Sequence, residues 1–192
     1  MTVVLITDIK QQGAALILSL ILLMAMTMLG LSSTRSAILE EKMFHNMRDI
    51  AISFEAAEAG LREVETWLQQ QTSKPLVNER NFVYLPDELP EPIKQNHQWW
   101  VSLENTGTYG IDSSAGLEQV KLQPRFVLEY VSFLPDTPLP EDQIPNGIHI
   151  YRATCRATGA SNASQSILQT TLSKRFNSEA DSVRRLSWRQ LR

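Results

Sequence analysis

The sequence predicts an α+β fold, in which a long N-terminal α-helix packs on a C-terminal antiparallel β-sheet. Three observations predict it. The run from Gly13 to Leu31 is apolar apart from Ser19 and Thr27. A helical repeat follows this run and meets no proline until Pro75. Beyond that proline, segments rich in aromatic and β-branched residues alternate with turn residues, which is typical of strands that follow one another in a sheet.

The apolar run has the length of a membrane span. Its 19 residues extend over roughly 28 Å as a helix, close to the thickness of a bilayer's hydrocarbon core. No charged residue occurs between Lys10 and Arg35. The run could be a secretory signal peptide, a plain anchor, or a signal cut at its polar front edge. The first fits worst, because secretory apolar regions are shorter and carry a small-residue cleavage site behind them.

Beyond the apolar run, apolar residues recur with alternating spacings of four and three, the a/d pattern of a helix with one apolar stripe. Charged residues such as Glu55, Glu58 and Arg62 occupy other positions and keep those faces in water. Together the two patterns predict one helix from about residue 14 to about residue 70, roughly 85 Å long. The stripe is expected to lie on the sheet and comprises Met43, Met47, Ile50, Phe54, Ala57, Leu61, Val64 and Leu68.

The segment after the helix predicts an antiparallel sheet, because strands follow one another without intervening helices. The clearest strand reads RFVLEYVSFL. One face of the sheet is expected to receive the helix, and the other to meet solvent or neighbouring molecules. The predicted strands are Asn81–Leu85, Gln98–Leu103, Val120–Gln123, Arg125–Leu134, Ile148–Arg156 and Ser166–Phe176.

Charge is unevenly distributed along the chain. Residues 36–176 carry 12 Lys and Arg against 18 Asp and Glu, whereas residues 177–192 are basic. We expect this tail to be either a frayed surface segment or a short docking helix. The formal net charge of −3 gives no indication of nucleic-acid binding, which usually needs a basic excess on one face.

No catalytic constellation is present in the sequence. It contains no P-loop, no dinucleotide-binding glycine fingerprint, no HExxH, no GxSxG and no CxxC. We therefore expect no enzyme, no cofactor and no metal site. The single cysteine, Cys155, is expected to be buried as a small hydrophobe. Trp99 and Trp100 would put one indole on each face of a strand, so that one belongs to the core and the other is a candidate partner contact.

The residues Lys10-Gln11-Gln12-Gly13-Ala14 stand directly before the apolar run. They resemble a prepilin peptidase site, in which a short basic or polar leader ends in glycine. The resemblance implies a cut between Gly13 and Ala14, after which Ala14 is the mature and N-methylated first residue.

Two longer segments resemble the PilX-type minor pilins of type IV pili. SFEAAEAGLREVETWL is similar to the segment that follows their hydrophobic helix, and YRATCRATGASNASQSILQTTLSKRF is similar to their C-terminal region. The resemblance implies a pilin-like fold and a structural subunit that joins other major and minor pilins through its N-terminal helix. The other implied partners are prepilin peptidase, the inner-membrane assembly machinery and, before assembly, inner-membrane lipid.

One departure from the family pattern bears on function. Major pilins carry a glutamate at mature position five, and counting from Ala14 places Leu18 there. In lacking this glutamate, the chain resembles minor pilins that initiate assembly or sit at the tip. PilX-type proteins are also implicated in adhesion and aggregation. Two alternatives stay open: a pseudopilin of type II secretion, and an uncleaved membrane-anchored periplasmic receptor or adaptor.

The expected organisation follows from these segments. Residues 1–13 are the leader, 14–35 the membrane and pilus-core helix, and 36–72 its amphipathic continuation. Residues 73–176 form the β-rich domain, and 177–192 the basic tail. The expected location is first the inner membrane, as a single-pass protein with the β-domain in the periplasm, and later the pilus.

Overall fold

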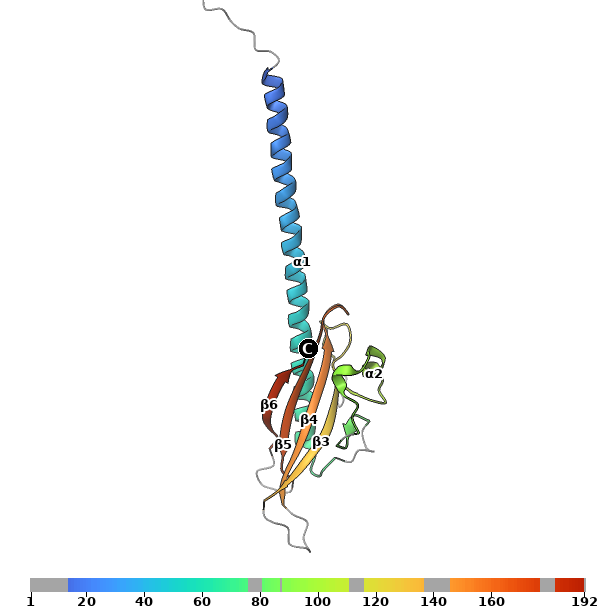
Figure 1. Ribbon diagram of the computed structural model, residues 1–192. Coiled ribbons are helices and arrows are strands. Elements are labelled where there is room, and N and C mark those ends of the chain that lie inside the picture. Colours follow the sequence, from blue (N-terminus) through green and yellow to red (C-terminus); the bar gives the residue numbers. More distant parts are fainter. Residues whose placement is uncertain are drawn as a thin grey trace, which may run out of the picture. The chain divides into compact units, whose positions relative to one another are not determined.

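The computed structural model describes residues 14–75, 81–86, 88–110, 116–136, 146–176 and 182–191. The chain divides into two compact units, Met1–His45 and Asn46–Arg192. The helix α1 (Ala14–Gln70) contributes residues to both (Figure 1). The predicted leader, residues 1–13, and part of the predicted tail, residues 177–181 and 192, lie outside the described residues.

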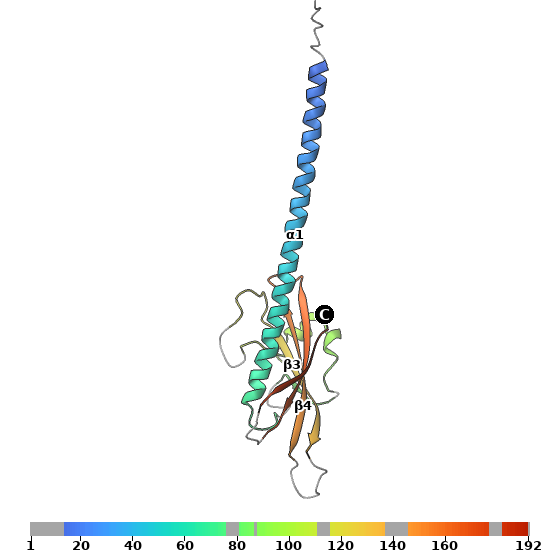
Figure 2. The ribbon, with the colours of Figure 1, turned by 90° about the vertical axis from the view of Figure 1, so that its left-hand side faces the viewer.

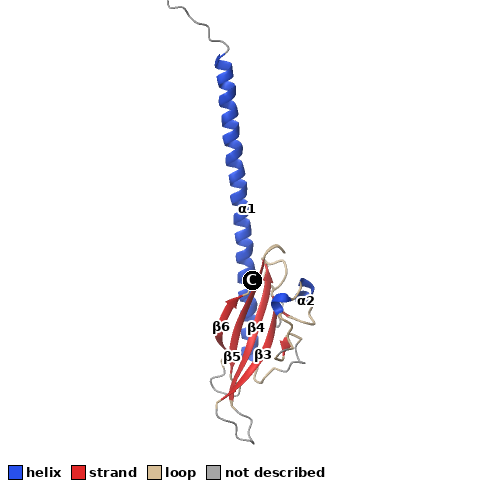
Figure 3. Cartoon of the chain, in the orientation of Figure 1, coloured by secondary structure: helices blue, strands red, loops and turns tan. Residues whose placement is uncertain are grey.

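The second unit holds a six-stranded sheet (Figure 3). Its strands lie in the order β1-β3-β4-β5-β6, and β2 also pairs with β3. Every pairing is antiparallel except that of β1 with β3, which is parallel. The strands are β1 (Val83–Tyr84), β2 (Gly107–Thr108), β3 (Arg125–Pro135), β4 (Gly147–Thr158), β5 (Gln165–Lys174) and β6 (Arg184–Gln190).

The register of the long strands sets which residues meet the helix. Phe126 lies opposite Cys155, and Cys155 lies opposite Leu168. Because side chains alternate across a strand, these three and every second residue from them point to the same face, up to the register shift in β3 between Tyr130 and Ser132. The C-terminal part of α1 lies along this face (Figure 2). The sheet and this part of the helix therefore share one core.

The core is built from both elements. All its members are at most 4% exposed, and Phe82 bridges Trp67 and Phe126 by edge-to-face ring contacts. Burial of this apolar surface is the main source of stability, at roughly 25 cal/mol per Å². The helix contributes Ala56, Ala57, Leu61, Val64, Trp67 and Leu68, and the three long strands contribute Phe126, Leu128, Tyr151, Ala153, Cys155, Ala157, Leu168 and Leu172.

Small helix residues allow the close approach of α1 to the sheet. A Cβ added at Gly60 would lie 2.4 Å from Cys155 Sγ and 3.0 Å from Pro124 Cβ. Ser53, about two helical turns earlier, is fully buried and its hydroxyl lies 2.8 Å from that of Ser166. The helix thus meets the sheet through glycine, alanine and serine as well as through the leucines of the predicted stripe.

The predicted stripe extends too far toward the N-terminus. Ala57, Leu61, Val64 and Leu68 are fully buried, and Phe54 is half-buried. The expectation that Met43, Met47 and Ile50 also lie on the sheet is wrong, because their side chains are 57%, 70% and 56% exposed. The helical period continues through these residues, but the contacts with strands end near residue 53.

Three other predicted elements differ. Residues 98–103 were expected as a strand but fall largely in α2 (His97–Val101), which Asn96 caps by accepting a hydrogen bond from the Trp99 amide. Residues 120–123 form no strand and contain a bend at residues 121–122. The described part of the basic tail is neither frayed nor helical, since residues 184–190 form β6 and pair with β5.

A buried lysine closes the C-terminal end of α1. Lys174 is 1% exposed, and its Nζ donates hydrogen bonds to the carbonyl oxygens of Leu68, Gln69 and Gln71 at 2.6–2.9 Å. The last carbonyls of a helix have no partner within the helix and carry its negative dipole end. The Lys174 ammonium group therefore gives these carbonyls a hydrogen-bond donor and also places a positive charge at the negative end of the helix dipole.

Candidate functional site

The apolar N-terminal part of α1 is the first candidate for an interaction site. It contains a window with mean hydropathy 2.5, none of which is buried. By length and composition, α1 is the one helix of the described residues that could cross a membrane. An apolar surface of this size calls for a lipid or protein environment.

Hydroxyl groups within this part of α1 are satisfied inside the helix. Ser19 donates to the Leu16 carbonyl and Thr27 to the Met24 carbonyl, each at 2.8 Å. Such back-bonding removes the cost of placing a hydroxyl in an apolar environment. The two polar residues of the run are thus compatible with lipid or with a packed helix bundle.

The predicted cleavage site lies at the edge of the described chain. Ala14 is the first residue of α1, whereas Gly13 lies outside the described residues. Leu18 is on the helix with 67% of its surface exposed. A leucine here adds to the apolar surface, where an ionised carboxylate in lipid would cost about 2.5–3.5 kcal/mol by insertion scales.

A carboxylate joins α1 to the turn between β4 and β5. Asp49 Oδ1 accepts a hydrogen bond from the Ser161 amide at 3.0 Å, and Oδ2 accepts from the Ser161 and Ser164 hydroxyls. Burial raises the pKa of Asp49, but the hydrogen bonds from these serines outweigh it and hold the pKa below its ordinary value. We call this arrangement the Asp49 clasp.

Strand β6 is held against α1 by polar and aromatic contacts. Arg185 forms ion pairs with Glu58 and Glu65, at 3.4 and 2.7 Å. The Trp188 indole donates to Glu58, and its ring meets Phe54 edge-on at 6.0 Å between centroids. Arg185 and Trp188 therefore dock this strand on the acidic face of the helix.

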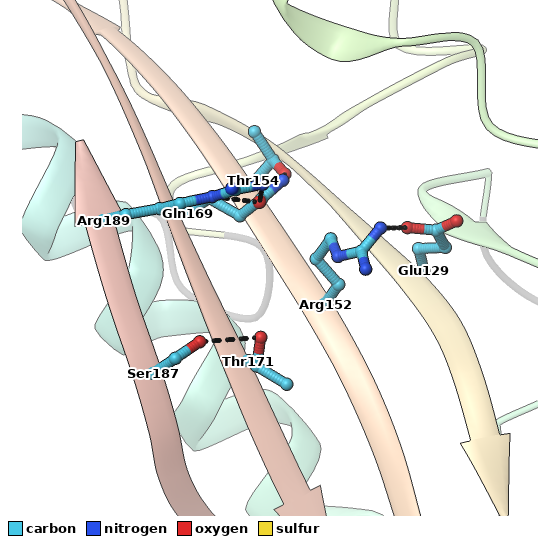
Figure 4. A network of polar contacts seen from close by, with 7 residues as sticks. All are labelled: Glu129, Arg152, Thr154, Gln169, Thr171, Ser187 and Arg189. Atoms are coloured by element: carbon cyan, nitrogen blue, oxygen red, sulfur yellow. Dashed lines mark hydrogen bonds and ion pairs between the residues drawn. The ribbon is translucent and has the colours of Figure 1, made fainter. Parts of the chain in front are cut away.

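The face of the sheet turned away from α1 carries a polar network (Figure 4). Arg152 of β4 pairs with Glu129 of β3 at 3.2 Å. Gln169 of β5 donates to Thr154 at 2.8 Å and accepts from Arg189 of β6. These bonds tie neighbouring strands together across this face.

The two tryptophans lie on α2 and not on a strand. Trp100 is fully buried, and its indole donates to the Pro92 carbonyl at 3.2 Å. Trp99 is half-buried and meets the Trp100 ring edge-on at 5.2 Å. One indole in the core and one nearer the surface is the division that the sequence predicts, but on a helix. A partner contact through Trp99 stays a prediction.

Groups that could carry chemistry are dispersed within the described residues. No group of three or more His, Cys, Asp and Glu side chains there could hold a metal ion. Cys155 is buried, and burial together with the charge of Glu58 raises the pKa of its thiol. A protonated, inaccessible thiol is a poor nucleophile.

Burial and the charge of Lys74 lower the pKa of His149, whose ring lies among Tyr130, Phe133 and Phe176.

Sequence reasoning missed the Asp49 clasp, the Lys174 cap and strand β6. The tail offered a signal for β6, because the apolar Leu186 and Trp188 alternate there with the polar Arg185, Ser187 and Arg189. The other two depend on contacts between residues more than 100 positions apart. Nothing in the local pattern around Asp49 or Lys174 indicates their partners.

A helix that is apolar and exposed at one end, and forms the core of a sheet domain at the other, defines a pilin-like α+β protein. Two family models match the chain: PilX N-terminal over residues 12–62, and Type IV pilus assembly protein PilX C-term over residues 54–174. The chain belongs to the PilX family, and so to the minor pilins of type IV pili. No curated protein and no solved structure matches it.

Proposed function

We propose that this PilX-family subunit initiates assembly of a type IV pilus and stays at or near its tip. The observation that carries the proposal is the absence of any acidic residue from the apolar part of α1, with Leu18 at the fifth position from Ala14. A subunit that lacks this carboxylate has no group to neutralise the amino terminus of a subunit already in the fibre. It is therefore suited to be a first subunit.

Transfer from membrane to fibre is driven by packing of the apolar helix. In lipid there is little hydrophobic gain from helix association, so van der Waals fit and small residues decide the geometry. Ala25, Gly30 and Ser32 supply small side chains in this part of α1. A Cβ added at Gly30 would meet nothing within 4 Å in the chain itself, which leaves room there for a neighbouring helix.

The family match supports a pilus component over the two alternatives. The model that matches residues 54–174 is described as a type IV pilus assembly protein, which favours a pilus subunit over a type II secretion pseudopilin. An uncleaved receptor or adaptor would keep residues 1–13. No contact among the described residues favours adhesion or aggregation, so priming is the function that we propose.

The test compares pili in a strain that lacks this protein, complemented with three versions of it. The wild type should restore pilus number at low abundance relative to the major pilin. Leu18→Glu supplies the missing carboxylate and should raise the amount of this subunit per pilus, because it can now be added above existing subunits. Leu22→Glu carries the same charge one helical turn later and is the matched control.

The readouts are pili per cell by electron microscopy, the ratio of the two subunits in sheared pili by mass spectrometry, and immunogold labelling along the fibre. Priming predicts label at pilus ends for the wild type and along the shaft for Leu18→Glu alone. Unchanged pilus number in the strain that lacks the protein would refute priming. Equal incorporation of Leu18→Glu and Leu22→Glu would refute the role given to position 18.

A further inference from the structure

A small cavity lies on the sheet face opposite α1, where α2 and the ends of β3 and β4 meet. Its volume is about 40 Å³. Its polar lining comes from His97 of α2, Gln123, Arg125 of β3, and Arg156 and Thr158 of β4. Val101 and Leu122 are its apolar lining residues. It is separate from the helix surfaces through which a pilin assembles.

Two buried donors in this cavity have no hydrogen-bond partner among the described residues. They are Arg125 Nη1 and Thr158 Oγ1, and both atoms are inaccessible to solvent. Thr158 is 6% exposed, so its hydroxyl cannot turn to bulk water. Buried polar groups in native proteins are almost always satisfied, and an unpaired one usually marks a ligand, an ion or a water.

The charge around these donors is positive. Arg125 lies directly opposite Arg156 in the β3–β4 register, and like charges in that position destabilise a sheet unless something lies between them. Arg156 is oriented by Gln165 Oε1 at 2.8 Å and meets His97 Nδ1 at 3.3 Å. No aspartate or glutamate is among the described residues that line the cavity.

We propose that this cavity is a binding site for a small oxyanion. A guanidinium and a hydroxyl are donors that suit sulfate, phosphate or a carboxylate group. A water molecule needs at least roughly 10–15 Å³, so a cavity of about 40 Å³ has room for more than one oxygen atom of such a group. The anion accepts from Arg125 Nη1 and Thr158 Oγ1 and separates the two facing arginines.

The experiment measures anion binding to the full chain in neutral detergent micelles. Tryptophan fluorescence during thermal unfolding is recorded with increasing sulfate, phosphate or acetate. Chloride replaces them at constant ionic strength, since sulfate also stabilises proteins generally by exclusion from their surface. Ligands that bind only the native state raise its unfolding temperature along a saturating curve.

Three variants locate the effect. Arg125→Gln removes the charged donor, and Thr158→Val removes the hydroxyl while keeping the shape of the side chain. Each should weaken binding by about tenfold or more, because a charge-assisted or buried hydrogen bond is lost. Arg152→Gln is the matched control, since Arg152 lies on the same strand and face but pairs with Glu129 outside the cavity.

Saturable binding of at least one oxyanion, weakened in both cavity variants and kept in Arg152→Gln, is the expected result. A response to sulfate or phosphate identifies a free ion, whereas a response to acetate alone identifies a carboxylate of the kind that another protein presents. The same dependence on chloride as on sulfate, phosphate and acetate in the wild type would overturn the proposal, because the cavity would then hold only water. Equal binding by the wild type and Thr158→Val would also overturn it, and this holds even where Arg125→Gln does not fold.

Discussion

Asp49 accepts hydrogen bonds from two serines that follow it by 112 and 115 positions. The backbone at Gly159 also comes close to this carboxylate, because a Cβ added at Gly159 would lie 2.3 Å from Asp49 Oδ1. The clasp therefore depends on one carboxylate, two hydroxyls and a glycine that lets the turn come close. It joins α1 to the turn between β4 and β5 and lies N-terminal to the contacts of α1 with the strands, which end near residue 53.

The ionised form of Asp49 should stabilise this unit. Because the folded pKa lies below the ordinary value of about 3.9, the stabilisation is present above that value and is lost as pH falls through the folded pKa. Asp49→Asn should therefore lower the free energy of unfolding by about 1 kcal/mol at neutral pH. In acid, where the wild type is protonated, the two proteins should converge.

Urea unfolding at neutral and acid pH checks this prediction. Glu55→Gln is the control, because Glu55 lies less than two turns away on the same helix and has no hydrogen bond or ion pair within the described part of the chain. Equal stability of Asp49→Asn and the wild type at neutral pH would mean that the clasp contributes nothing measurable.

At the scale of elements, β6 is the edge strand of the sheet and all seven of its residues are exposed. It is attached through its pairing with β5 and through the side chains that reach α1. Exposed edge strands expose unpaired backbone groups and are liable to pair with other chains. Arginines at 184, 185 and 189 are the kind of charge that discourages this pairing.

Trp188→Ala should separate docking of β6 from strand pairing. The substitution removes the ring contact with Phe54 and the hydrogen bond to Glu58, so we expect a loss of about 1 kcal/mol. Leu186→Ala is the matched control, because Leu186 is on the same strand with 57% of its surface exposed. Thermal unfolding measures both, and an equal effect of the two would show that Trp188 adds nothing to docking.

The long elements could be predicted from the sequence because their patterns are sustained. The apolar run and the a/d repeat predicted one helix over residues 14–70, and α1 has these bounds. RFVLEYVSFL and the two alternating segments after it became β3, β4 and β5. Each of these signals extends over nine or more residues, so a single residue that departs from the pattern does not change the predicted element.

The predictions of short elements were wrong where a local signal decided the structure. Gln98–Leu103 has the aromatic content of a strand, but the Asn96 cap begins a helix at His97. Within the helix stripe, the period could not indicate where the sheet ends, so Met47 and Ile50 were assigned to an interface that they do not reach. The oxyanion cavity could not be predicted at all, since it joins α2 to residues about 30 and 60 positions later.

At the scale of the whole molecule, the two units differ in whether their apolar side chains are buried within the chain. The second unit has a core of its own, with the buried members of α1 between residues 53 and 68. Residues 14–31 have no such core, and their large apolar side chains are more than half exposed. This division is what a subunit needs if one unit stays folded while the other exchanges lipid for neighbouring helices.

Removal of the leader is the step that would permit this exchange. We predict that the mature chain begins at Ala14 in cells with prepilin peptidase, and retains Met1 in cells without it. Intact mass and N-terminal sequencing measure the difference. Retention of Met1 in both strains would favour the uncleaved receptor or adaptor, and a cut between Ser33 and Ala37 would make the chain a secreted domain without the apolar helix.

The Lys174 cap has a consequence for the order in which the domain folds. Its bonds to the end of α1 join residues 103–106 positions apart, whereas β3, β4 and β5 pair with neighbours in sequence. Contacts between distant residues form late, because the entropy of closing a long loop must be met first. The hairpins should therefore form before the helix docks. Until β5 is complete, the carbonyls of the last turn of α1 and the stripe beside them stay open to proteases and to mispairing.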